Sequence, residues 1–87
     1  MFPKETHPRP KEIAPEHQEL MKEIGARIKA YRTAKGKGYI EMAKDIGVSR
    51  NNYNLIELGK LYCKFSTLLK ILDYHEVSVT EFFKDIK

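Results

Sequence analysis

The chain has 87 residues, enough for one hydrophobic core, which excludes a separate catalytic or ligand-sensing domain within it. Hydrophobic residues make up 41% of it, with no run near the ~20 apolar residues of a membrane span and no apolar signal segment after Met1, so we expect a cytoplasmic protein. The formal charge of +4 is concentrated in residues 22–64, which hold ten Lys and Arg against four Asp and Glu. This concentration of positive charge fits either a polyanionic partner or a solvated lysine-rich surface.

The first fifteen residues contain all four prolines of the chain, mixed with charged side chains. This composition indicates an extended arm over residues 1–14, because proline breaks helices and few apolar groups are present to form a core. Pro15 suits the first position of a helix. An apolar stripe follows at spacings of four, four and three residues, made of Leu20, Ile24, Ile28 and Tyr31. The stripe predicts a helix that ends near residues 35–36.

Two short helices are predicted on either side of a Gly-Val-Ser turn. The first follows Gly38 and stops at Gly47, since glycine readily adopts the left-handed conformation that turns the chain. Its inward side chains are Met42, Ala43 and Ile46. Ser49 is a favourable N-cap for the second helix, which runs to residue 58 and ends at Gly59. The side chains expected on its buried side are Tyr53 and Ile56.

Two further helices complete the expected fold. One begins at Ser66 or Thr67, and the last one is capped by Ser78 or Thr80. Their apolar residues are Leu68, Leu69, Ile71 and Leu72 in the first and Phe82, Phe83 and Ile86 in the last. Because no segment alternates with period two, the sequence predicts an all-α domain of five helices over residues 15–87.

The segment Tyr39–Gly59 has the pattern of a helix-turn-helix. It resembles the phage-repressor (Cro/XRE-type) family, whose signature reads roughly L-A-x-x-x-G-V-S and then x-x-x-I-x-x-I-E-x-G-K. The matching positions are Met42, Ala43, Gly47, Val48, Ser49, Tyr53, Ile56, Glu57, Gly59 and Lys60. The similarity extends over residues 20–86. It implies a five-helix, lambda-repressor-like domain that binds specific DNA sequences and regulates transcription as a repressor.

In such a motif the N-terminal half of the second helix faces base edges in the major groove, and the first helix crosses the DNA backbone. The residues expected to face the bases are Arg50, Asn51, Asn54 and Leu55. Arg can bond guanine, Asn can bond adenine, and Leu can contact a thymine methyl group. Arg50 fits a phosphate contact equally well. The candidates for backbone contacts are Tyr39, Ser49, Asn52, Lys60 and Lys64, and Asn52 fits a solvent-facing position equally.

The resemblance also bears on the structural roles of four residues outside the expected DNA contacts. The resemblance implies a partly buried ion pair between Arg32 and Glu57, with two unrelated surface charges as the alternative. Lys37 stands at a position that is usually apolar in the family. His75 stands where leucine is usual, and there we expect a neutral, hydrogen-bonded core histidine.

Two functions stay open. The first is a regulator that binds double-stranded DNA, expected to be a homodimer on a palindromic site. The second is an antitoxin-like or other protein-interaction module, with a toxin or another protein as partner, and an antitoxin can be both. Leu55 and Leu58 bear on the choice, since these positions are more often polar or basic in the family. They fit a methyl contact with packing on the next loop, or a surface turned toward protein.

Self-association is expected through Phe83 and Ile86. A last helix this short can bury only one of its faces. Phe82 should therefore fill the core while Phe83 points out of it toward a second copy. The alternative is that both aromatic side chains pack within one chain. The sequence shows no paired carboxylates, no phosphate loop and no nucleophile with a nearby base, so we expect no enzyme. A single Cys63 and scattered histidines lack zinc-ligand spacing, so we expect no metal and no cofactor.

Overall fold

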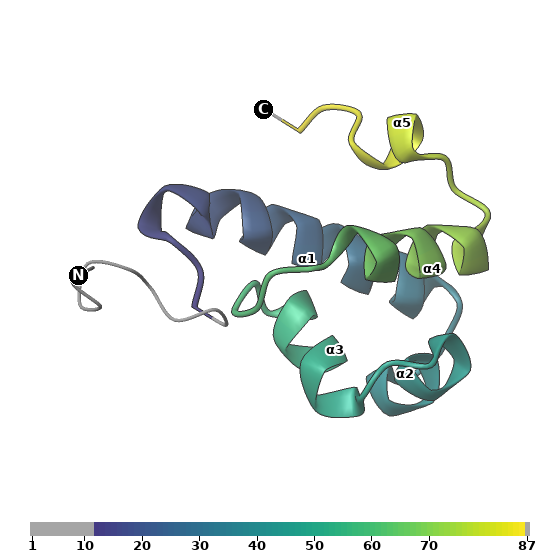
Figure 1. Ribbon diagram of the computed structural model, residues 1–87. Coiled ribbons are helices and arrows are strands. Elements are labelled where there is room, and N and C mark those ends of the chain that lie inside the picture. Colours follow the sequence, from purple (N-terminus) through teal and green to yellow (C-terminus); the bar gives the residue numbers. More distant parts are fainter. Residues whose placement is uncertain (1–11, 87) are drawn as a thin grey trace.

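The computed structural model describes residues 12–86, and Figure 1 shows how its elements follow one another. All regular structure in this part of the chain is helical. A 3-10 turn, Pro15–His17, is followed by α1 (Gln18–Ala34), α2 (Tyr39–Ile46), α3 (Arg50–Glu57), α4 (Phe65–His75) and α5 (Val79–Phe82). The predicted all-α fold of five helices is therefore confirmed. The predicted arm, residues 1–14, lies outside the described residues except for 12–14.

Helix α1 is the longest element, and it buries the face that the apolar stripe predicts, with one exception. Ile24 and Ile28 belong to the core, but Leu20 is 38% exposed and Met21 packs against the core in its place. At about 100° per residue, Met21 lies only about 20° around the helix from Ile28, whereas Leu20 lies about 80° away. A spacing of four residues repeated twice therefore carries Leu20 off the buried face.

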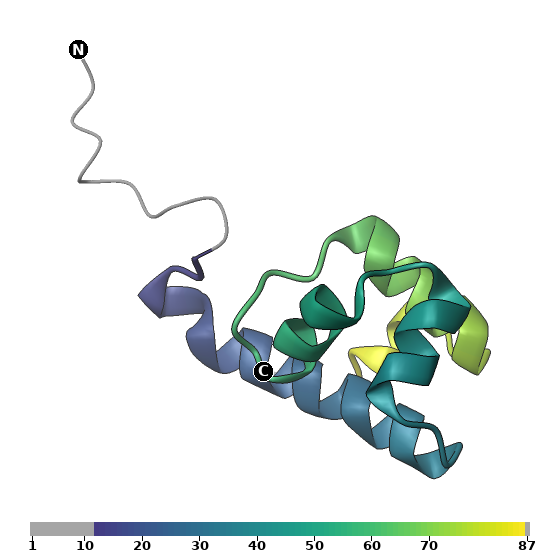
Figure 2. The same ribbon diagram turned by 90° about the horizontal axis from the view of Figure 1, so that it is seen from below.

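The turn between α2 and α3 forms as predicted. Gly47 ends α2 with a φ of 76°, a left-handed conformation that glycine adopts without steric cost. The Ser49 hydroxyl oxygen caps α3 by accepting a hydrogen bond from the Asn52 amide at 3.1 Å. Helices α2 and α3 pack closely on each other, with the small Ala43 buried at the core, and Figure 2 shows the pair on one side of α1.

Helix α3 approaches α1 more closely than ordinary side chains would allow. A Cβ atom added to Gly25 of α1 would collide with the backbone carbonyl oxygens of Ile56 and Glu57 in α3. Just past α3, Gly59 has a φ of 74°, and a Cβ atom there would lie 2.7 Å from the Cα of Lys22. Both contacts involve backbone atoms, so two glycines set how close the second half of the helix-turn-helix lies to α1.

The core joins side chains from all five helices. It consists of Ile24, Ile28, Met42, Ala43, Ile46, Tyr53, Ile56, Leu68, Ile71, Leu72 and Phe82. Helix α4 begins at Phe65, one or two residues before its predicted start, and Leu69, one of the apolar residues expected in this helix, is 37% exposed. Within residues 12–86, no helix combines the length and apolar character needed to cross a membrane.

The last helix is shorter than the sequence predicts. Ser78 caps it as expected, with its hydroxyl oxygen accepting from the Glu81 amide at 3.0 Å, but α5 ends at Phe82. The Arg27 guanidinium of α1 donates to the carbonyl oxygens of Phe82 and of Lys84, at 2.9 and 2.6 Å. A cation held at these carbonyls stabilises the chain end in a non-helical path. Ile86 therefore lies beyond the helix that was expected to carry it.

His75 is buried as expected, but its predicted hydrogen bond is wrong. The ring packs against the rings of Tyr31 and Tyr74, with centroid distances of 5.5 and 5.2 Å. Neither ring nitrogen has a hydrogen-bond partner among the described residues, because the neighbouring groups present ring carbons. Burial, helped by the positive charge of Lys35, lowers the pKa of His75 and favours the neutral imidazole.

Candidate nucleic-acid interface

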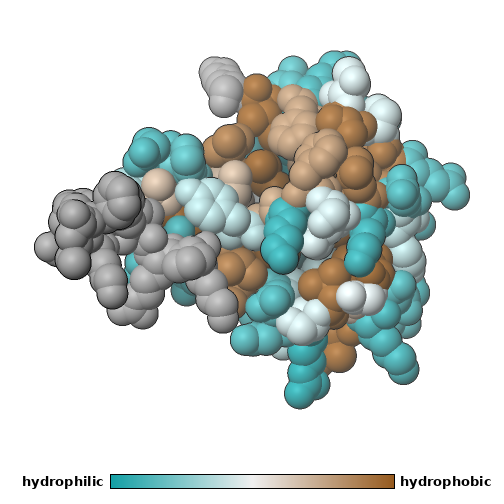
Figure 3. All heavy atoms as spheres, in the orientation of Figure 1, coloured by the Kyte–Doolittle hydropathy of each residue, from teal (hydrophilic) through white to brown (hydrophobic). Residues whose placement is uncertain are grey.

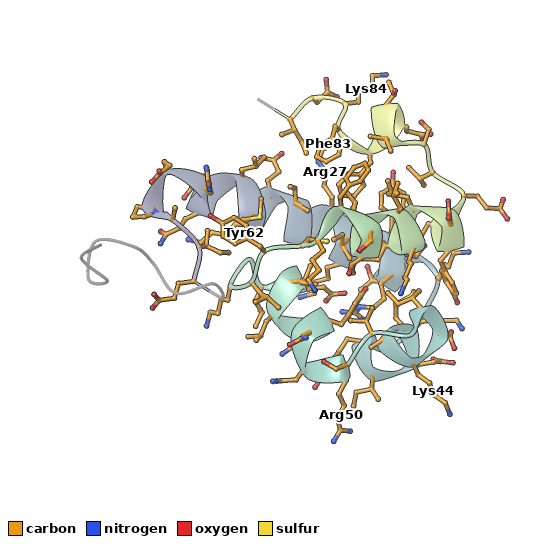
Figure 4. All side chains as sticks on the ribbon, in the orientation of Figure 1. Arg27, Lys44, Arg50, Tyr62, Phe83 and Lys84 are labelled. Atoms are coloured by element: carbon orange, nitrogen blue, oxygen red, sulfur yellow. The ribbon has the colours of Figure 1, made fainter. Side chains whose placement is uncertain are left out.

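The first turn of α3 faces outward from the helix-turn-helix. Arg50 and Asn51 are exposed, and no acidic residue lies in this turn. Figure 4 shows Arg50 pointing away from the body of the molecule, at the end opposite Arg27 and Phe83. A helix N-terminus carries partial positive charge, so this turn presents a cationic surface with hydrogen-bond donors to any anionic partner.

The second turn of α3 lies closer to the body. Asn54 and Leu55 are half-buried, whereas Arg50 and Asn51 are exposed. Leu58, which follows the helix, is 49% exposed. The structure thus separates the four expected base-facing residues into two that project fully and two that reach outward only in part.

The residues expected to contact phosphates come from three places. Tyr39 is half-buried at the start of α2, Ser49 and Asn52 lie in the N-terminal turn of α3, and Lys60 and Lys64 are exposed in the loop 58–64 between α3 and α4. The Ser49 oxygen is already an acceptor in the helix cap. Its hydroxyl proton remains able to donate to a phosphate oxygen.

Arg32 of α1 and Glu57 of α3 lie against each other and form a two-point ion pair. Nε of Arg32 lies 2.6 Å from Oε2 of Glu57, and Nη2 lies 2.9 Å from Oε1. The side chains are only 11% and 4% exposed. The third guanidinium nitrogen, Nη1, donates to the backbone carbonyl oxygen of Lys37 at 2.7 Å. One side chain therefore joins α1, the turn before α2 and the end of α3.

The charges of this pair affect each other and the tyrosine beside them. The hydrogen bonds to Glu57 raise the pKa of Arg32, so the guanidinium stays charged. Burial, with a contribution from the neighbouring Glu57 carboxylate, raises the pKa of the Tyr53 hydroxyl, so this group stays neutral. The ion pair thus lies over a neutral, buried ring. This environment excludes water from the contact and fixes the orientation of α3 on α1.

A second polar cluster was not predicted from the sequence. Nζ of Lys37 lies 2.7 Å from Oδ2 of Asp45, and the Tyr74 hydroxyl donates to the same oxygen at 3.2 Å. The Lys37 ammonium also lies 5.6 Å from the centre of the Tyr74 ring. The cluster links Lys37, two residues before α2, to the end of α2 and to α4. The only signal in the sequence was a lysine at a usually apolar position.

The Lys37–Asp45 pair changes where the positive charge of the middle segment is available. Because Asp45 neutralises Lys37, the free cations near the helix-turn-helix include Lys44, Arg50, Lys60 and Lys64. Figure 4 shows Lys44 projecting from the same edge of the molecule as Arg50, a placement that the sequence did not single out. Figure 3 shows a broad hydrophobic surface at the opposite end, beside α5, whereas hydrophilic and hydrophobic side chains mix along the edge that carries Arg50.

Comparison with models of known protein families identifies the family of this chain. A model described as "Helix-turn-helix domain" matches residues 23–82, from within α1 to the end of α5. The chain belongs to this family. A search of curated protein sequences found no significant match.

Two solved structures share the fold of this helix-turn-helix protein. A mutant of the restriction–modification controller protein C.Esp1396I superposes with a TM-score of 0.68 at 26% identity, covering 76% of this chain and 88% of that one. The clp gene regulator ClgR from C. glutamicum gives a TM-score of 0.67 at 21% identity, covering 86% of this chain and 88% of that one. The resemblance to helix-turn-helix regulators, inferred from the sequence, is confirmed, and with it the class of DNA-binding transcriptional regulator.

Proposed function

We propose that this helix-turn-helix protein is a cytoplasmic repressor without catalytic activity, which binds a palindromic operator as a homodimer and inserts α3 into the major groove. The observation that carries this proposal is the first turn of α3. It is exposed and free of acidic residues, and it projects from the body on a helix held by the Arg32–Glu57 pair. Repression needs only occupancy of the operator, which a DNA-binding module by itself can supply.

Direct base reading is assigned to the residues of α3 that face outward. Arg50 bonds guanine O6 and N7, or clamps a phosphate at the groove edge. Asn51 bonds adenine N6 and N7. The half-buried Asn54 and Leu55 complete the surface, Asn54 by a hydrogen bond to a base edge and Leu55 by contact with a thymine methyl group or by excluding water.

Phosphate contacts are assigned to groups on both sides of α3. Ser49 and Asn52 lie at its start, Tyr39 lies at the start of α2, and Lys60 and Lys64 follow its end. Contacts of this kind fix the register of α3 in the groove but do not read sequence. Each lysine that neutralises a phosphate also releases counterions, so affinity should fall steeply with added salt.

Homodimerisation is assigned to the apolar surface at the α5 end. Phe83 and Ile86 are half-buried and pack on the core of their own chain, which is the second of the two arrangements expected for the aromatics. Val79 of α5, which is 39% exposed, provides further apolar surface for a second copy. Because this end lies opposite Arg50, contact here leaves α3 free for DNA (Figure 4).

A pair of substitutions separates base reading from backbone binding. Asn51→Ala should weaken binding to the selected site by about 1–3 kcal/mol and flatten discrimination at one base pair, with little change on unrelated DNA. Lys60→Ala should weaken all sequences alike and reduce the salt slope by about one unit. The measurement is binding across a salt series, after selection of sites from a random DNA pool.

The same selection tests the proposal as a whole. Enrichment of a palindrome supports it, and preserved site preference in Asn51→Ala would show that α3 is wrongly oriented in the groove. An antitoxin-like or other protein-interaction module is the second candidate, favoured by the exposure of Leu58 and by Phe65, which is 61% exposed. No enrichment at low salt would support that candidate instead.

A further inference from the structure

The loop 58–64 is held against the start of α1 by the side chain of Tyr62. The Tyr62 hydroxyl oxygen accepts a hydrogen bond from the Ala14 amide at 3.1 Å and lies 2.7 Å from Nδ1 of His17. The Tyr62 ring meets the His17 ring edge to face, with a centroid distance of 5.8 Å. Figure 4 shows Tyr62 beside the start of α1. These contacts join segments that are more than forty residues apart in the sequence.

Few other hydrogen bonds hold this half of the loop among the described residues. The Gly59 and Lys60 amides donate to carbonyl oxygens at the end of α3, and Gly59 packs on Lys22, so the beginning of the loop is fixed by the helix. From residue 61 to residue 64, however, no backbone amide donates to a group among the described residues. The Cys63 thiol reaches only the neighbouring Lys64 carbonyl, at a long 3.6 Å.

The space beneath the loop is also incompletely filled. A small cavity of about 100 Å³ lies between the loop, α3 with the turn before it, and the start of α4. Its lining includes Val48, Ile56, Leu61 and Tyr62. Leu61 and Cys63 are partly buried against the core, and the hydrogen bonds of Tyr62 supply the main polar fixed point of the loop after Lys60.

We infer that Tyr62 is a positioning residue for DNA binding, which orders the loop so that Lys60 and Lys64 already lie where phosphates are met. Tyr62 stands between the two lysines, two residues from each. Ordering a loop before binding removes an entropic cost from the binding step, so the effect appears in affinity and not in base preference. The inference rests on the phosphate contacts assigned to these lysines in the proposed function.

The test is Tyr62→Phe in the full chain, which keeps the ring and removes only the hydroxyl. Loss of a hydrogen bond of this kind should weaken binding about three- to tenfold, equally for the selected site and for unrelated DNA. In the free protein, amide hydrogen exchange of residues 58–64 should become faster. The matched control is Tyr74→Phe, which removes a hydroxyl bonded to Asp45, remote from the loop, and should leave DNA affinity unchanged.

A double-mutant cycle separates positioning from a merely structural role. In a Lys60→Ala/Lys64→Ala background the loop has no ammonium group left to place, so Tyr62→Phe should change affinity by less than about twofold. An equal loss in both backgrounds would overturn the inference while leaving the phosphate contacts intact. A Tyr62→Phe protein that melts earlier but binds DNA normally would overturn it too. Normal binding by the double-lysine variant would overturn both the inference and the phosphate contacts of the proposed function.

Discussion

Replacing Glu57 by glutamine should test how strongly the buried ion pair holds α3 in place. The substitution keeps the size of the side chain and removes its charge, which leaves the buried Arg32 guanidinium without a negatively charged partner and replaces one acceptor oxygen by an NH₂ donor. Because the two side chains are only 11% and 4% exposed, water cannot take the place of the lost carboxylate. Breaking a buried pair in this way costs about 3–5 kcal/mol.

This loss is large for a domain of this size. At the usual stability of about 0.05–0.15 kcal/mol per residue, a chain of this length has a free energy of unfolding of about 4–13 kcal/mol. The Glu57→Gln protein should therefore lose about a quarter or more of its stability, and its Tm should fall by about 12–40 °C. Urea unfolding followed by far-UV circular dichroism measures the difference in free energy directly.

An exposed ion pair on α1, the helix that also carries Arg32, provides the control. Nη2 of Arg27 lies 3.4 Å from Oε2 of Glu23, with side chains 27% and 49% exposed. Because solvent screens this pair, Glu23→Gln should cost less than about 1 kcal/mol. If Glu57→Gln destabilised the protein no more than Glu23→Gln, the conclusion that the Arg32 contact holds α3 would be refuted.

Three further predictions concern stability. Gly25→Ala should cost about 1–3 kcal/mol or more in urea unfolding, because the added methyl group meets the α3 backbone, whereas Gly38→Ala, with open space around its Cβ position, should cost less than half as much. The lowered pKa of His75 means that the unfolded chain binds the proton more tightly, so stability should be retained above about pH 6.5 and fall as the pH drops below it. A His75→Leu variant without a shallower pH dependence between about pH 4 and 6.5 would contradict this cause. The Lys37 hydrogen bond lowers the pKa of Asp45, so the stability that it contributes should be present above the unfolded value of about 4 and disappear at lower pH. Asp45→Asn, followed by thermal melts across that range, should lose this part of the acid dependence.

The positions at which most helices start and stop could be predicted from the sequence because the causes are local. Gly47 ends α2 through its own left-handed conformation, and Ser49 and Ser78 cap helices through amides three residues away. Such signals act within one turn of chain, so a single sequence is sufficient to find them. The family resemblance added the pairing of Arg32 with Glu57, which no local rule could have supplied.

Tertiary structure alone decided the features that depend on groups far apart in the chain. Arg27 ends α5 by holding carbonyls more than fifty residues away, and His75 loses its expected hydrogen bond because its neighbours are two tyrosine rings. Tyr62 meets the start of α1 across a similar separation. A side chain's partners across the fold leave no periodic trace in the sequence, because periodicity records only which face of a helix is buried and not which groups it meets there.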